Sequence, residues 1–339
     1  MLKEALKSLY KQEFVSEEII ASMFAKRGLN FEFRSYRFGA VTGFLIEGLG
    51  EQAFVPTRSV SCLNKTLGRV TTSQMRALES KIPLPLFMGF GDMESQIHSV
   101  QKAGGAAADL WLAKIFTPAV ASVYMRRYFE NSHALSPYIQ IIYESVEAYF
   151  MEMDHVAIMA LLPVIEGGLR NVQEINLGHS DSNIRTEEFG RRLGEMIIKH
   201  GESQAPGVSV YPGSSSADNV SLDFFSHVNP QCDVINAFRI FFKEVLYKPS
   251  YVAPDSFNRH LILHLLRSDF ASPANYVRVF LLLAYITFCE RLTNSSIPML
   301  WPGSDEGSVR IAKYFAELSL KVGEPRSRMW RPGEPMPCK

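Results

Sequence analysis

The residues best suited to chemistry lie in one apolar run, FNRHLILH, at positions 257–264. This run places Arg259, His260 and His264 beside leucine and isoleucine side chains. An imidazole can exchange a proton near neutral pH, and a guanidinium offers fixed donors to an anion. Burying such groups without partners is costly, so the run is either a satisfied structural network or a reactive site.

Helical geometry limits how these side chains can meet. We expect a helix that begins within 254–256, where Asp or Ser can cap it, and continues to about residue 267. His260 and His264 are four residues apart and share a face, whereas Arg259 and His264 lie about 140° apart around the helix. Arg259 would therefore have to curl back to meet His264. The free N–H groups of the first turn would also favour an anion such as a phosphodiester.

A second polar pair, Glu166 and Arg170, lies in LLPVIEGGLRNV, within a helix expected over 153–176. One interpretation is a surface ion pair between residues four apart, worth a few tenths of a kcal/mol. The other is that this face lines a groove in which Glu166 orients Arg259 or a histidine. The two adjacent glycines would then allow a neighbouring helix to approach closely.

Arg259 and His264, with four residues between them and the polar His260 directly after the arginine, resemble the signature of the HEPN superfamily (higher eukaryotes and prokaryotes nucleotide-binding domains). The stretch 257–292 is similar to prokaryotic HEPN proteins, in which such a helix is followed by a polar turn and a very hydrophobic helix. An EG.LR helix like that around Glu166 precedes the signature in similar proteins. The resemblance covers roughly residues 150–295 and is specific over the last 40 or so. Relatives often carry Gly where this chain has Leu265.

The resemblance implies metal-independent RNA cleavage, in which a ribose 2′-hydroxyl attacks the adjacent phosphate. His264 would carry the proton, and Arg259 would stabilise the charge that develops on the phosphate. The supporting or RNA-binding residues would be Asn258, His260, Glu166 and Arg170. One histidine cannot easily be both acid and base, and HEPN relatives are thought to pair two signatures in a homodimer cleft. Such a protein would be a toxin or antiviral defence effector, with a regulatory or antitoxin partner.

The alternative is a non-catalytic helical module that binds RNA, a nucleotide or a protein through the same cleft. The chain has 35 basic and 35 acidic residues, so its formal net charge is zero. Nucleases usually have a more basic surface, and this balance favours the alternative. In either case RNA would have to be bound by a local patch.

Several other functional classes have no support in the sequence. The four cysteines are widely spaced without a CxxC pair, the other histidines lack metal-ligand spacing, and no phosphate-binding glycine loop is present. We therefore expect no metal and no cofactor. The cysteine usage fits a reducing cytoplasm, and no signal peptide or membrane-spanning stretch is apparent. The expected location is cytoplasmic, without a membrane partner.

Helical periodicity dominates the chain, and 47% hydrophobic residues suffice for a sizeable core. The predicted fold is all-α: a C-terminal HEPN-like helical bundle and an N-terminal helical region with a small irregular or β excursion over 28–69. We expect three parts, namely a mostly helical region (1–150), a HEPN-like domain (151–322) and a disordered tail (323–339). The Gly/Ser/Pro-rich segment after residue 200 is expected to be a long loop.

Overall fold

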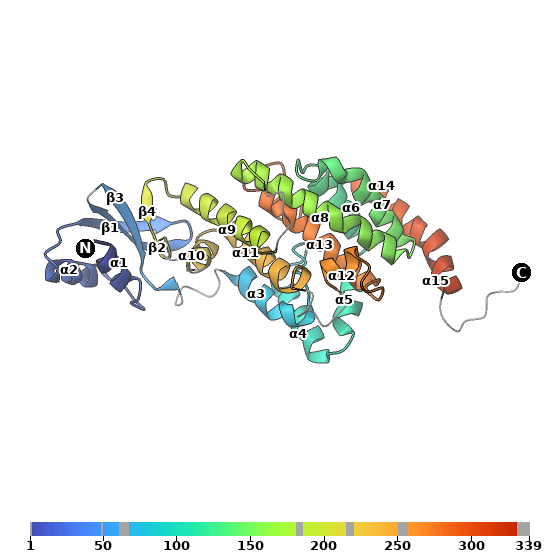
Figure 1. Cartoon of the computed structure of the whole chain (residues 1–339), viewed down its shortest axis with the longest axis horizontal. Helices are drawn as coiled ribbons and strands as arrows, with labels where there is room; N and C mark the ends of the chain where they lie inside the picture. Colours follow the sequence, from blue (N-terminus) through green and yellow to red (C-terminus); the bar gives the residue numbers. More distant parts are fainter. Residues whose placement is uncertain are drawn as a thin grey trace, which may run out of the picture. The chain divides into compact units, whose positions relative to one another are not determined.

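The described part of the chain is mostly helical, as expected, and carries a small sheet (Figure 1). The computed structural model describes residues 2–48, 50–60, 68–180, 186–214, 220–249 and 257–330. The chain forms two compact units, each built from two separate stretches. Unit 1 comprises Met1–Thr72 and Arg191–Arg239, and unit 2 comprises Ser73–Gly190 and Ile240–Lys339.

Unit 1 contains a four-stranded sheet in the order β1-β2-β3-β4. Its strands are β1 (Glu32–Phe38), β2 (Val41–Gly48), β3 (Glu51–Pro56) and β4 (Val208–Val210). The first three form an antiparallel meander, which confirms the β excursion as the correct alternative for this region. β4 pairs parallel to β3 and comes from the segment that we expected to be a loop. The expectation failed because a three-residue strand is too short to show alternation.

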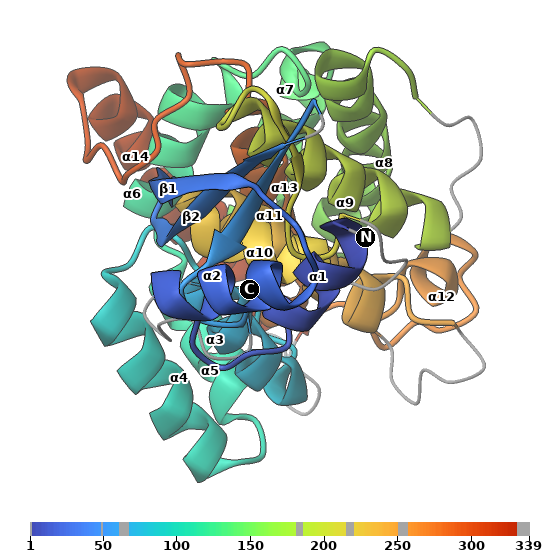
Figure 2. The ribbon, with the colours of Figure 1, turned by 90° about the vertical axis from the view of Figure 1, so that its left-hand side faces the viewer.

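Helices cover both faces of this sheet. α1 (Leu2–Leu9) and α2 (Glu17–Lys26) share an apolar core with one face, through residues such as Leu6, Phe24 and Ile46 (Figure 2). On the other face, Phe38 and Phe54 meet Phe224 of α10 (Val220–Val228), with ring centroids 5.6 and 5.9 Å away. The alternation of side chains along a strand supplies these two apolar faces.

Three helices have residues in both units: α3 (Arg69–Ala77), α9 (Thr186–Ser203) and α11 (Pro230–Phe241). The remaining elements of unit 2 are helical. They are η2 (Leu78–Ser80), α4 (Phe90–Ala103), α5 (Ala107–Ile115), α6 (Pro118–Val123), η3 (Tyr124–Phe129), η4 (Ser136–Tyr138), α7 (Ile139–Phe150), α8 (Asp154–Leu177), η5 (Phe242–Leu246), α12 (Arg259–Leu263), α13 (Pro273–Glu290), α14 (Glu306–Leu318), η6 (Ser319–Gly323) and α15 (Glu324–Trp330).

The core of unit 2 is built around α13. Every residue from Ala274 to Glu290 is buried, as expected for a helix that is apolar on all sides. α13 packs against α8 and α5, and α8 also packs against α7. At Gly168 an added Cβ would lie 2.8 Å from Leu135 and 3.2 Å from Ile286 of α13. The absence of a side chain at Gly168 therefore lets Leu135 and Ile286 pack closely against α8, as we expected of the glycine pair at 167–168.

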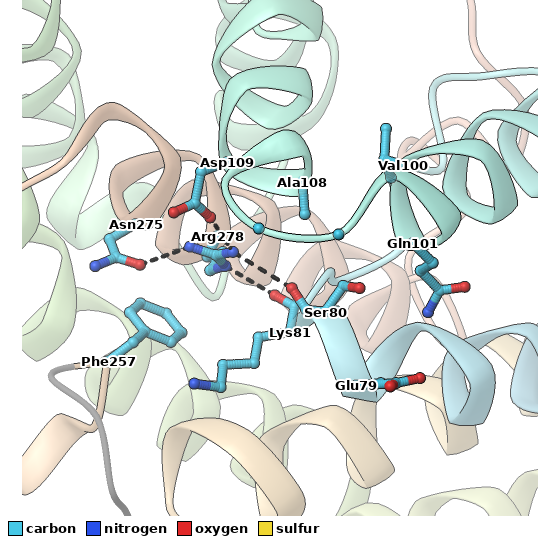
Figure 3. A pocket seen from close by; sticks show the side chains of 12 residues that line it. Glu79, Ser80, Lys81, Val100, Gln101, Ala108, Asp109, Phe257, Asn275 and Arg278 are labelled. Carbon is cyan, nitrogen blue, oxygen red and sulfur yellow. Dashed lines mark hydrogen bonds and ion pairs between the residues drawn. The ribbon is translucent and has the colours of Figure 1, made fainter.

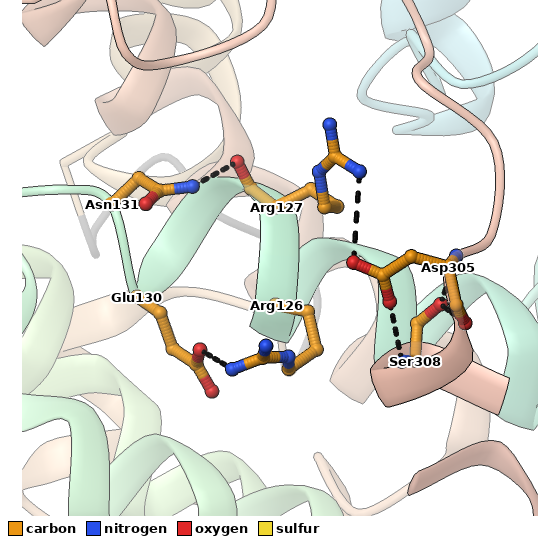
Figure 4. Close-up of polar contacts among 6 residues, drawn as sticks. All are labelled: Arg126, Arg127, Glu130, Asn131, Asp305 and Ser308. Atoms are coloured by element: carbon orange, nitrogen blue, oxygen red, sulfur yellow. Dashed lines mark hydrogen bonds and ion pairs between the residues drawn. The ribbon is translucent and has the colours of Figure 1, made fainter. Parts of the chain in front are cut away.

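A polar cluster joins α14 to the π-helical turn η3 (Figure 4). Asp305 caps α14 in a capping box with Ser308, and its carboxylate also lies 3.6 Å from Nη1 of Arg127. The preceding Arg126 forms an ion pair with Glu130, the residue that follows η3. These contacts connect segments almost 180 residues apart in sequence.

The expected boundary at 150/151 falls inside unit 2, between α7 and α8. The hydroxyl of Ser145 on α7 donates to the carbonyl of Ala157 on α8, so the two helices belong to one core. The expected tail at 323–339 is also partly wrong, because α15 continues the helix to Trp330; residues 331–339 lie outside the described part of the chain. Within the described residues, no helix is long and apolar enough to cross a membrane.

Candidate functional site

The helix that carries the predicted motif is shorter than expected. α12 spans only Arg259–Leu263, and its N-cap is Asn258. The expected start within 254–256 lies outside the described residues, and in the described part the cap lies further along the chain. The Asn258 Oδ1 accepts from the N–H groups of His260 (3.0 Å) and Leu261 (3.3 Å), and its Nδ2 donates to the carbonyl of Lys248 (2.6 Å). Asn258 is buried, so its side chain positions α12.

The backbone conformation at the end of α12 is one that favours Gly directly after His264. His264 is the C-cap, and Leu265 has a positive φ of 50°. The Leu265 N–H donates to the carbonyl of Ile262 (3.0 Å), and the Leu266 N–H donates to that of Leu261 (2.9 Å). This is the Schellman arrangement, in which the residue after the C-cap is left-handed and usually Gly. The chain makes the same turn with a leucine.

Arg259 is held by two residues of other elements. Its Nε forms an ion pair with Oε1 of Glu166 on α8, and its guanidinium carbon lies 5.6 Å from the ring centre of Tyr247. The Tyr247 hydroxyl donates to the same Glu166 oxygen at 2.9 Å. The side chains of Arg259 and Glu166 are 20% and 10% exposed, so the pair is mostly shielded from solvent. Burial and the adjacent Glu166 carboxylate raise the pKa of Tyr247, which keeps its proton for this bond.

Glu166 thus contacts Arg259, the contact expected under the second interpretation of this helix. Among the described residues, no ion pair joins Glu166 to Arg170, although the two are four apart on α8. Arg170 is half-buried, and its charge acts on Tyr247, whose pKa it lowers slightly against the upward effect of burial. A supporting or RNA-binding role of Arg170 stays a prediction.

The two histidines lie at the surface. His260 and His264 are exposed, and their ring centroids are 4.6 Å apart with an interplanar angle of 57°. Arg259 does not curl back to His264 as expected; its guanidinium turns to α8 instead. The physical reason is that a nearby carboxylate attracts a guanidinium more strongly than an imidazole does.

A pocket of about 430 Å³ adjoins the segment that leads into α12 (Figure 3). In its wall, the buried Arg278 of α13 donates to the carbonyl of Lys81 (2.8 Å) and to the side chains of Asn275 (2.7 Å) and Asp109 (2.6 Å). Its guanidinium carbon also lies 5.6 Å from the ring centre of Phe257. These contacts satisfy a charge inside a very apolar helix. They also join α13 to the residue that precedes the cap of α12.

Within the described ranges, no group of three or more His, Cys, Asp or Glu side chains could hold a metal ion. Sequence reasoning did not identify Tyr247, Lys248 or Phe257 as neighbours of the motif. No local signal could have found Tyr247, because it meets a residue 81 positions away.

No family model, curated protein or solved structure matches this chain. The resemblance to the HEPN superfamily therefore remains a prediction that rests on residues 150–295.

Proposed function

We propose that this protein is a metal-independent endoribonuclease of the HEPN type, acting as a toxin or antiviral defence effector. One observation carries the proposal: a single short helix carries a guanidinium whose orientation is fixed by Glu166 and, within one turn, two exposed imidazoles. If the two histidines belonged to a buried polar network, their rings would be buried and hydrogen-bonded inside the protein. His260 and His264 are exposed, which favours a role toward a ligand.

Arg259 would bind and stabilise the phosphate that is attacked. Glu166 occupies its Nε, and in the part of the chain that the structure describes its two Nη groups have no hydrogen-bonding partner. These groups form the outward edge of a planar fork, which suits two oxygens of a phosphate. A guanidinium whose orientation is already set needs no reorganisation as charge builds up in the transition state.

His264 would move the proton. As a base it removes the proton of the 2′-hydroxyl, whose oxygen then attacks phosphorus; as an acid it protonates the departing 5′-oxygen. The products are a 2′,3′-cyclic phosphate and a free 5′-hydroxyl. His260, one turn away on the same face, would contact or orient the RNA.

A second copy of the chain would complete the site. One imidazole cannot easily be both acid and base in a single turnover, and a two-fold homodimer through the surface around α12 would supply another. Leu265 and Leu266 support this because they are 62% and 60% exposed directly beside His264, and a partner could cover them. A regulatory or antitoxin partner could cover the same surface.

The decisive experiment incubates the purified protein with total RNA in EDTA. We expect cleavage that leaves 2′,3′-cyclic phosphate ends. Arg259→Ala and His264→Ala should each lower the rate roughly 100-fold or more. Two exposed residues on other helices serve as matched controls, Arg310→Ala on α14 and His98→Ala on α4, and should keep wild-type rates. A wild-type dimer that leaves RNA intact would refute the proposal.

The alternative is a non-catalytic module that binds RNA, a nucleotide or a protein at the same surface. It is favoured by the zero net charge and by the carboxylate of Glu166, which already neutralises Arg259. In that case Arg259→Ala would weaken binding of labelled single-stranded RNA, and no cyclic phosphate would form with any variant.

A further inference from the structure

The two exposed histidines of α12 have a geometry that the reaction above does not require. His260 lies within the helix and His264 caps its end, four residues later. Their rings project together from the surface, with centroids 4.6 Å apart and planes inclined at 57°. Neither ring is buried, so water and small ions can reach both.

We propose that His260 and His264 form a two-histidine site for a borderline divalent transition metal ion, with Zn²⁺ as the representative ion. An imidazole nitrogen bound to Zn²⁺ lies about 2.0–2.1 Å from the metal, so each ring centroid lies roughly 3 Å from it. At tetrahedral or right-angled coordination, two such rings have centroids about 4.5–5 Å apart. The observed 4.6 Å falls in this range.

The residue types decide which ions would bind. Neutral imidazole suits Zn²⁺, Cu²⁺ and Ni²⁺, while Mg²⁺ and Ca²⁺ prefer oxygen ligands. Because the described residues supply no cluster of three ligands, water would fill the other positions. The site would therefore be weaker and more readily exchanged than a structural zinc centre. It is a regulatory site and departs from our expectation that the chain binds no metal.

Metal binding would inhibit the nuclease, a consequence that rests on the proposed function. A metal takes the lone pair of the imidazole nitrogen that it binds, and His264 needs a lone pair to act as a base. The bound ion would also occupy the space beside His264 that the RNA must enter. Zn²⁺ would thus act as a reversible inhibitor of an enzyme that needs no metal.

The binding test uses the full-length protein, titrated with Zn²⁺ in a calorimeter and with Cu²⁺ in an electron paramagnetic resonance experiment. We expect one Zn²⁺ per chain, no competition from Mg²⁺, and nitrogen couplings from two imidazoles in the Cu²⁺ spectrum. His260→Gln and His264→Gln should each weaken binding roughly tenfold or more. His98→Gln, a change at an exposed histidine on α4, should leave binding unchanged. Both α12 histidines are exposed, so unchanged melting temperatures will show that the variants fold.

If the double variant His260→Gln, His264→Gln binds Zn²⁺ as tightly as wild type does, the proposed metal site is wrong. The regulatory half has its own readout, the ratio of RNA cleavage with and without Zn²⁺. For wild type, Zn²⁺ should lower the cleavage rate, so the ratio should be well below one, and EDTA should restore the rate. For His260→Gln the ratio should stay much closer to one. Zn²⁺ binding without inhibition would overturn the regulatory half alone. Zn²⁺ binding by a wild-type protein that never cleaves RNA would overturn the proposed function and leave the metal site standing.

Discussion

Glu166 is the residue on which the orientation of Arg259 depends. Its Oε1 accepts two hydrogen bonds, one from the charged guanidinium of Arg259 and one from the neutral hydroxyl of Tyr247. Since both partners come from distant parts of the chain, this carboxylate links α8 to the segments at 247 and 259. Its removal should therefore affect stability and the motif together.

We predict that Glu166→Gln lowers the free energy of unfolding by about 2 kcal/mol, because a mostly buried guanidinium loses its counter-charge. Tyr247→Phe removes only a neutral hydrogen bond and should lower it by about 1 kcal/mol. Urea unfolding of both variants measures the difference. If Glu166→Gln is no more destabilised than Tyr247→Phe, the Arg259 contact adds nothing to stability.

Asp154, the first residue of α8, should destabilise the protein at neutral pH. Its Oδ1 is buried without a hydrogen-bonding partner. Burial, helped by the nearby Glu152, raises the pKa of this carboxyl to about 6 from its usual 3.8. The folded state then holds the proton more tightly than the unfolded chain does. Stability from this group is fully present below pH 3.8 and is lost as the pH rises through 6.

We predict that Asp154→Asn raises the free energy of unfolding by about 1 kcal/mol at pH 7–8, after allowance for partial exposure and for the lost helix-dipole interaction. The gain should shrink toward zero as the pH falls below 4. Urea unfolding across this pH range tests it. Asp92→Asn, which removes an exposed carboxylate from the first turn of α4, is the control and should show no gain. A pH-independent gain at position 154 would show that burial of the charge is not the cause.

At the level of secondary structure, the turn after α12 decides how the motif is presented. Its Schellman hydrogen bonds place Leu265 in the left-handed region, where a Cβ is unfavourable by roughly 1–2 kcal/mol. The same side chain is 62% exposed, so it gains little from packing. A leucine in place of the glycine that is usual at this cap position therefore keeps the backbone path and adds strain.

Leu265→Gly should stabilise the protein by about 1 kcal/mol, since the strain relieved exceeds the added freedom of the unfolded chain. Thermal and urea unfolding measure the change. Leu266→Gly is a matched control, because Leu266 is equally exposed and lacks a positive φ, and it should lower stability by about 0.5–1 kcal/mol. Equal effects at the two positions would argue against a left-handed Leu265.

Glu290, at the end of α13, acts as a tertiary cap. This fully buried carboxylate accepts from the Ser132 hydroxyl (2.5 Å) and from the N–H groups of His133 (2.8 Å) and Ala134 (3.0 Å). It also accepts from the Asn294 side chain at 2.7 Å. The turn before η4 is thereby attached to the central helix.

Replacing this carboxylate with an amide in Glu290→Gln should lower the free energy of unfolding by about 3 kcal/mol, because charge-assisted bonds to buried donors are lost. Hydrogen exchange at His133 and Ala134 should accelerate at the same time. Glu174→Gln, at an exposed position of α8, should change stability by less than about 0.5 kcal/mol. Slow exchange at both amides in Glu290→Gln would contradict the capping role.

At the level of the whole molecule, neither unit is a continuous piece of chain. The strand β4 joins a sheet whose other strands end some 150 residues earlier, and the core of unit 2 combines residues on both sides of position 150. A cut at 150/151 would separate α7 from α8 and α5 from α13.

We therefore predict that the fragment 151–339 does not fold cooperatively alone, and that it regains structure when co-expressed with 1–150. Circular dichroism and copurification of the two halves report this. The full-length chain, purified in parallel, gives the reference helicity and unfolding transition. A cooperative transition of 151–339 alone would instead support an independent C-terminal domain.

Local patterns were sufficient for much of this protein. Periodicity predicted a mostly helical chain and a helix over 153–176, which agrees with α8 because that helix is long. The apolar run of α13 predicted its burial. The motif at 259–264 could be found because charged side chains are conspicuous beside Leu and Ile.

Tertiary contacts decided the rest. Glu166 has two arginines within reach, one four residues away and one 93 residues away, and it pairs with the distant one. Helical spacing favours the nearer arginine only weakly, because a pair four residues apart on a helix is worth a few tenths of a kcal/mol. The pair with Arg259 is shielded from solvent and is held by the packing of distant segments. Tertiary packing also decided three other features: the short strand β4, the division into two units, and the exposure of His260 and His264. Each depends on which distant segment packs there, and local spacing carries no information about that.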